Sequence, residues 1–136
     1  MIRFYANQAG YLPKGRKIAV LAQENRADER EKVQDKEVTL WNEKGEQTAV
    51  KQAVYAGVDE SAEDKVWHID FSDLTEEGTV TFQDGEGAVL GSCIISSKAY
   101  HTLNQTLCKA LYFQRCGMAL EETFAGKFRR CTCHTG

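Results

Sequence analysis

Three residues near residue 136 have side chains that bind soft metal ions. Cys131, Cys133 and His134 lie within three residues of one another, in the run CTCH. A structural zinc site uses four ligands, usually cysteine thiolates and histidine nitrogens, and this run supplies at most three. Cys116, in the run QRCG, could fold back to join them. Because the spacing matches neither a zinc finger nor a zinc ribbon, metal ligation and unengaged thiols are both open on spacing alone.

The same thiols could also serve redox or covalent chemistry. The sequence contains no C-x-x-C pair of the redox type. A cysteine nucleophile needs a base and an orienting group, and neither His134 nor His101 has a position that forces such a pair. The chain has five cysteines, so they cannot all pair with one another, and four lie in its last quarter. This distribution favours metal ligation or reduced thiols over a disulfide framework.

Sugar chemistry would use different residues. Glycoside hydrolysis needs two carboxylates held a few ångströms apart, whereas the acidic runs DESAED and LEE fall in turns or at helix ends. Trp41, Trp67 and Tyr55 could form an aromatic platform for sugar rings, although packing in a β-sandwich core is the simpler explanation. The run DGEGAVLGS lies between two expected strands and opens no helix, which excludes a phosphate-binding loop.

The residues up to about 96 are expected to form a sheet. About seven short strand-like runs are separated by glycine-containing and charged turns: 2–8, 17–22, 37–42, 49–57, 66–74, 79–84 and 88–96. In the fifth run, Trp67, Ile69 and Phe71 alternate with more polar residues, and a charged connector separates the second run from the third. This pattern is typical of an antiparallel, immunoglobulin-like β-sandwich, but it leaves the strand order open.

The periodicity changes after residue 97. Four apolar residues recur at helical spacing: Tyr100, Leu103, Leu107 and Leu111. They predict an amphipathic helix of about 18 residues, ending near Gly117. The rest of the chain offers this helix no helical partner, so we expect it to pack against another body. The boundary between the two parts is placed at 96–98.

The bulk composition narrows the partners. A length of 136 residues suits about one domain, and the formal net charge of −3 argues against a nucleic-acid-binding face. No apolar run approaches the ~20 residues that a membrane span needs. The residues after Met1 alternate like a strand and lack the apolar core of a signal peptide. We therefore expect either a cytoplasmic protein or one whose leader is missing.

Three stretches, in this order, resemble one known family. NQAGYLPKGRKIAVL (7–21) and VWHIDFSDLTEEGTVTF (66–82) resemble parts of the N-terminal immunoglobulin-like domain of family-nine glycoside hydrolases, the endoglucanases and related cellulases. ALYFQRCGMALEETFAGKFRRCTCH (110–134) is similar to the first helix and loop of the catalytic (α/α)₆ barrel that follows. The resemblance implies an immunoglobulin-like β-sandwich over 1–97 and the start of a truncated all-α catalytic domain over 98–136.

The resemblance also implies a metal site. Many of these enzymes hold a structural zinc ion with a cysteine after the arginine of the first helix, a later Cys-His pair, and a histidine farther along. Cys116, Cys133 and His134 match three of these four positions, whereas Cys131 matches none. A fourth ligand would lie beyond residue 136.

The function implied is that of a non-catalytic brace. The family's catalytic residues belong to a DAGD segment and a late glutamate, and neither occurs in this sequence. The parent would be an inverting endo-β-1,4-glucanase that degrades cellulose and related β-1,4-glucans, and the chain alone would be inactive. The implied partners are the missing barrel, the glucan substrate of the parent and, through the exposed helix residues Leu107, Leu111 and Phe113, a second copy of this chain.

Two other classes remain alternatives. A standalone β-sandwich could bind carbohydrate through Trp41 and Trp67 without any enzyme role. A zinc-dependent interaction module is the second, with an open three-ligand site that holds the ion loosely. Most relatives are secreted, with a cytoplasmic location as the alternative for this chain.

Overall fold

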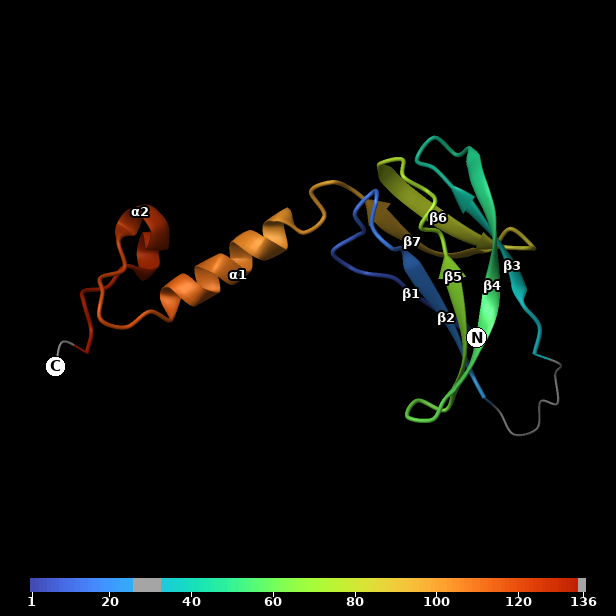
Figure 1. The fold of residues 1–136 in the computed structure, drawn as a ribbon, viewed down its shortest axis with the longest axis horizontal. Helices are drawn as coiled ribbons and strands as arrows, with labels where there is room; N and C mark the ends of the chain where they lie inside the picture. Colours follow the sequence, from blue (N-terminus) through green and yellow to red (C-terminus); the bar gives the residue numbers. More distant parts are fainter. Residues whose placement is uncertain (26–32, 135–136) are drawn as a thin grey trace. The chain divides into compact units, whose positions relative to one another are not determined.

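The computed structural model describes residues 1–25 and 33–134. Most of the expected charged connector, residues 26–32, lies outside the described residues. The chain separates into two compact units, Met1–Ala99 and Tyr100–Gly136. Figure 1 shows the fold of each unit.

The first unit is built from antiparallel strands, as predicted. Its strands are β1 (Ile2–Tyr5), β2 (Ile18–Glu24), β3 (Lys36–Trp41), β4 (Gln47–Asp59), β5 (Asp64–Asp70), β6 (Gly78–Asp84) and β7 (Val89–Ile95). They form one continuous sheet in the order β1-β2-β5-β4-β3-β6-β7. The prediction of a mainly β, immunoglobulin-like sandwich is therefore confirmed. The order, which the sequence left open, makes the long β4 the link between the two halves of the sheet.

The core follows the alternation seen in the sequence. Trp67, Ile69 and Phe71 are buried, whereas His68 and Asp70 between them are exposed. Successive residues of a strand point to opposite faces, so one face of β5 lines the interior. The buried apolar cluster comprises Tyr11, Ala19, Leu21, Val38, Leu40, Ala53, Trp67, Ile69, Phe71, Val80, Phe82, Cys93 and Ile95. A single core thus stabilises all of the sheet's central strands.

The sheet curls until its two edges meet, and Figure 1 shows β7 beside β1. The segment after β1 completes this closure, because the Tyr11 N–H donates to the Ile94 carbonyl at 2.8 Å and the Ser96 N–H donates to the Tyr11 carbonyl at 2.9 Å. The ring of Phe4 lies against Gly91 and packs on Phe82 with 4.9 Å between ring centroids. The contact between β1 and β7 covers part of both edges of the sheet, and exposed strand edges tend to pair with other chains.

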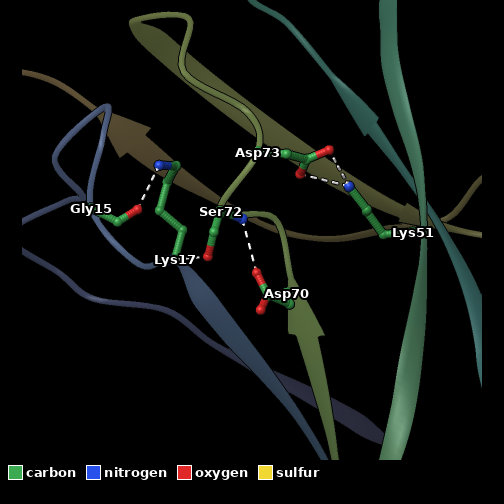
Figure 2. Close-up of polar contacts among 6 residues, drawn as sticks. All are labelled: Gly15, Lys17, Lys51, Asp70, Ser72 and Asp73. Atoms are coloured by element: carbon green, nitrogen blue, oxygen red, sulfur yellow. Dashed lines mark hydrogen bonds and ion pairs between the residues drawn. The ribbon is translucent and has the colours of Figure 1, made fainter.

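The two stretches of the sandwich that resemble the family, 7–21 and 66–82, contact each other. The Lys17 N–H donates to Ser72 Oγ at 2.9 Å, and the Phe71 N–H donates to the Lys17 carbonyl at 3.0 Å. Figure 2 shows this junction, with Ser72 also donating its N–H to Asp70. Hydrogen bonds from Ser72 hold the pKa of Asp70 below its usual range. Both stretches therefore stabilise the fold, because their polar groups form hydrogen bonds with one another.

Lys17 is buried together with its charge. Its side chain is fully enclosed, and its Nζ donates to the carbonyls of Leu12 at 3.2 Å, Pro13 at 2.6 Å and Gly15 at 2.9 Å. An ammonium group has three donors, so all three are satisfied. Burial of an unpaired charge is costly, and these carbonyl dipoles offset that cost. The loop over 12–15 is consequently wrapped around a cation, as Figure 2 shows for Gly15.

The Lys17→Met variant is expected to lower the free energy of unfolding by about 3 kcal/mol. It keeps the apolar volume but removes three donors from carbonyls that then need other partners. Urea unfolding followed by tryptophan fluorescence measures the change. Lys14→Met is the matched control, because Lys14 is exposed in the same loop and should shift stability by less than about 0.5 kcal/mol. Equal effects from both variants would contradict the role given to Lys17.

The second unit begins with the predicted helix, but the helix is shorter than expected. Helix α1 spans His101–Phe113, followed by α2 (Glu122–Ala125) and the 3₁₀ helix η1 (Gly126–Phe128). The expected length of about 18 residues is wrong, because α1 has 13 residues and ends at the cap Gln114, before Gly117. There the Arg115 N–H donates to the Tyr112 carbonyl at 3.2 Å, which tightens the last turn.

Helix α1 has no buried residue, and Leu111 on its apolar stripe is 69% exposed. An isolated helix of this length is marginal in water and usually depends on burial of its apolar face. Among the described residues, no helix has both the length and the apolar character needed to cross a bilayer.

Candidate metal centre

The candidate ligands lie on two segments that are paired through their main chains. The Leu120 N–H donates to the Arg130 carbonyl at 2.9 Å, and the Arg130 N–H donates back to Leu120 at 3.1 Å. The Gly117 N–H donates to the Cys133 carbonyl at 3.0 Å. These bonds place the residues after α1 alongside the CTCH run, so Cys116 comes next to residues distant in the sequence.

The pairing brings the three expected ligands together. The Sγ atoms of Cys116 and Cys133 and a ring nitrogen of His134 all lie within 4.8 Å of one another. His134 has a left-handed backbone with φ 55°. In an extended backbone, adjacent side chains would point in opposite directions, so this turn lets Cys133 and His134 face the same point. Cys131 is not in the group.

The donor set fits zinc. Thiolate sulfur binds Zn²⁺ at about 2.3 Å and imidazole nitrogen at about 2.0–2.1 Å, so tetrahedral ligand atoms lie roughly 3.5–3.8 Å apart. A group already within 4.8 Å reaches those separations by small side-chain rotations. Cys116 and His134 are exposed and Cys133 is partly buried, so an ion could enter without unfolding. Two thiolates and one imidazole leave a fourth position for water or another ligand.

The remaining cysteines do not belong to this group. All five cysteines are free, and Cys93 lies in the core of the sandwich. Burial raises the pKa of Cys93 to about 11, so its thiol stays protonated and unreactive near neutral pH. Cys108 is exposed on α1. Neither residue is a candidate ligand or nucleophile in the described structure.

The carboxylates around one hollow of the sandwich do not have the properties of a glycosidase pair. A small hollow is lined by Glu43, Glu76 and Glu77, together with other polar and apolar residues that include Lys44 and Leu74. The Thr79 N–H donates to Glu43 at 2.7 Å, and the Ser97 N–H donates to Glu77 at 2.8 Å. These hydrogen bonds lower the pKa of both carboxyls. Glycoside hydrolysis needs an acid with a raised pKa, so this hollow is poorly suited to that chemistry.

Of the residues that could have formed an aromatic platform, Trp67 instead packs in the core, as the core-packing interpretation predicts. Its ring is only 2% exposed, and its Nε1 donates to the Gln34 carbonyl at 3.0 Å. Lys36 and Tyr55 cover the ring, with Nζ 4.9 Å and the second ring centroid 5.6 Å from its centroid. Trp41 and Tyr55 are half-buried. The alternation of β5 already pointed to this outcome, because Trp67 shares its face with Ile69.

The β-sandwich and the paired segments after it define a class of protein, and comparison with known proteins identifies the family. Residues 3–87, more than half of the chain, match the family described as the cellulase N-terminal ig-like domain. The chain belongs to this family.

Similar proteins extend the match beyond the sandwich. A cellodextrinase of Butyrivibrio fibrisolvens is 34% identical over 135 residues, which cover 98% of this chain and 22% of that protein. The xyloglucan-specific endo-beta-1,4-glucanase BoGH9A of Bacteroides ovatus is 29% identical, with 94% of this chain and 20% of that protein covered. The solved structure of Bacteroides ovatus GH9 has a TM-score of 0.67 at 28% identity, covering 96% of this chain and 22% of that one.

A more distant structure shares the fold alone. It is a Zn-binding triple mutant of the family 9 endoglucanase J30, with a TM-score of 0.60, 21% identity, and coverage of 90% of this chain and 21% of that one. The chain spans about a fifth of the length of the curated relatives it matches. It therefore corresponds to a non-catalytic, N-terminal part of family-nine glycoside hydrolases.

Proposed function

We propose that this chain braces the catalytic barrel of a family-nine glycoside hydrolase that acts on β-1,4-glucans. The observation that carries the proposal is the match of 98% of this chain to only 22% of a cellodextrinase. In this proposal, 1–97 is the bracing sandwich and 98–136 is the start of the all-α catalytic domain. The catalytic carboxylates belong to the barrel, and the parent is an inverting endo-β-1,4-glucanase.

Zinc is the second part of the proposal. Cys116, Cys133 and His134 would hold a structural zinc ion, which would fix the loop after the first helix of the barrel. The convergence of their ligand atoms supports this assignment, and zinc binding is described for a triple mutant of the family 9 endoglucanase J30. Bound zinc would supply cross-linking of two chain segments, which is how structural zinc contributes to folding.

The proposed partners follow from the exposed stripe of α1. Leu103, Leu107 and Leu111 are each at least 46% exposed, and the barrel of the same polypeptide would cover them. For the isolated chain, we propose self-association through this stripe, which light scattering after size exclusion measures. We propose that the parent is located outside the cell, because secretion is implied for most relatives. Cell fractionation tests this against a cytoplasmic location.

Affinity electrophoresis in β-glucan gels tests the bracing role against a carbohydrate-binding role. A brace is expected to migrate equally with and without carboxymethylcellulose or xyloglucan in the gel. A binding module would be retarded in proportion to the glucan concentration. Trp41→Ala is the decisive variant, since Trp41 is the more exposed of the two platform candidates. Retardation of the wild type that this variant abolishes would overturn the bracing proposal.

A further inference from the structure

The side chain of Arg130 contacts the segment that carries Cys116. Its Nη2 donates to the Arg115 carbonyl at 2.6 Å and to the Phe113 carbonyl at 3.3 Å. Carbonyls at the C-terminal end of a helix have no intrahelical partner, and the helix dipole favours a cation there. The guanidinium group therefore caps α1 immediately before Cys116.

The main chain of Arg130 is bound to the same segment from the other side. Its N–H and carbonyl form the reciprocal pair with Leu120, four residues after Cys116. Arg130 thus holds the chain both before and after Cys116. Because Cys133 and His134 follow three and four residues later, the same anchor sets where these two ligands emerge.

We propose that Arg130 is a positioning residue of the metal centre, which clamps the Cys116 segment against the CTCH run so that the ligand atoms converge. This inference rests on the proposed zinc site. Holding two exposed segments together costs conformational entropy. A clamp formed during folding removes that loss from the binding step, and preorganisation of this kind raises affinity.

The neighbouring arginine provides a matched comparison. Arg129 Nη1 donates to Glu122 Oε2 at 2.5 Å, and both side chains are about two-thirds exposed or more. A surface ion pair of this kind contributes little. Arg129 has the same charge and lies one residue away. Among the described residues, its side chain makes no hydrogen bond to the Cys116 segment. Its removal therefore reproduces the change in charge without the loss of the clamp.

Cobalt and zinc titrations test the inference on the full 136-residue chain. Co²⁺ reports thiolate ligation through its sulfur-to-metal charge-transfer absorption, and zinc affinity follows from competition with a chromophoric chelator. We expect Arg130→Met to raise the Kd for both metals about tenfold, the low end of the ~10–100-fold range for groups that orient ligands, because Arg130 is exposed. Arg129→Met should stay within about twofold. Arg130→Lys keeps the positive charge and a hydrogen-bond donor but loses the planar guanidinium group, so its Kd should lie between those of the wild type and Arg130→Met.

The outcomes separate the clamp from the site. Equal affinities and equal cobalt spectra for Arg130→Met and wild type would overturn the inference, and so would equal losses from Arg129→Met and Arg130→Met. A wild-type chain that gives no thiolate–cobalt band would instead overturn the zinc site of the proposed function, and the clamp with it.

Discussion

Replacement of Cys116 by serine is expected to remove stoichiometric zinc from the chain. A serine hydroxyl is a poor zinc ligand, and its loss leaves only the adjacent Cys133 and His134. Loss of a direct ligand should exceed the ~10–100-fold penalty for disturbing an outer contact, so affinity should fall by more than about 100-fold. Zinc per chain after dialysis, measured by elemental analysis, gives the result directly.

Two cysteines serve as controls for that experiment. Cys108→Ser makes the same chemical change at an exposed position of α1, and Cys131→Ser makes it inside the CTCH run. Neither sulfur belongs to the converging group, so both variants should keep one zinc per chain. A Cys116→Ser chain that retains zinc while Cys131→Ser loses it would show that the ligands are wrongly assigned.

The Gly91→Ala variant is expected to destabilise the sandwich by about 3 kcal/mol. A Cβ at this position would overlap the ring of Phe4, which packs on the fully buried Phe82. Overpacking of a dense core typically costs ~1–3 kcal/mol, and the upper end applies because the overlap involves a ring held between β7 and the core. Thermal or urea unfolding of the variant measures the loss.

The contact with Phe4 can be isolated from other effects of the new methyl group. Gly85→Ala adds the same atom in the turn between β6 and β7, where nothing lies within 4 Å, and should be nearly neutral. Phe4→Leu should partly compensate Gly91→Ala, so the double variant should be more stable than the sum of the single losses predicts. Strict additivity would contradict the closure of the sheet through this contact.

The strands were predictable because each carries its own local signal. Trp67, Ile69 and Phe71 alternate with exposed residues, and the turns between strands contain residues such as Gly45 that take positive φ. The strand order was not predictable, since pairing between β3 and β6 depends on contacts between residues far apart in the sequence. The end of α1 was misplaced because a glycine at 117 suggested a stop that an earlier tight turn provides.

The metal centre shows a different limit. Spacing alone left Cys116, Cys133 and His134 undecided, and only the resemblance to family-nine enzymes selected them over Cys131. The sequence pattern also missed Arg130, which lies in the basic run KFRR. Its side chain reaches the carbonyls of Phe113 and Arg115 only after the chain has folded back. Contacts of a side chain with a distant main chain leave no periodic signal in a sequence.

Lys17 is another residue whose environment could not be predicted from the sequence. A lysine in a loop is ordinarily exposed, and nothing in the run LPKGRK distinguishes Lys17 from Lys14 by residue type. Its burial follows from the loop that returns over it and from the partner strand that fixes its main chain through Phe71.

Release of reducing ends from soluble β-glucans tests the central claim most directly, namely that these 136 residues are a non-catalytic part of a glucan-degrading enzyme. The purified chain, supplied with zinc, should release reducing ends from carboxymethylcellulose, xyloglucan and cellodextrins at the rate of buffer alone. Turnover that rises in proportion to the chain's concentration and persists after repurification would contradict the account.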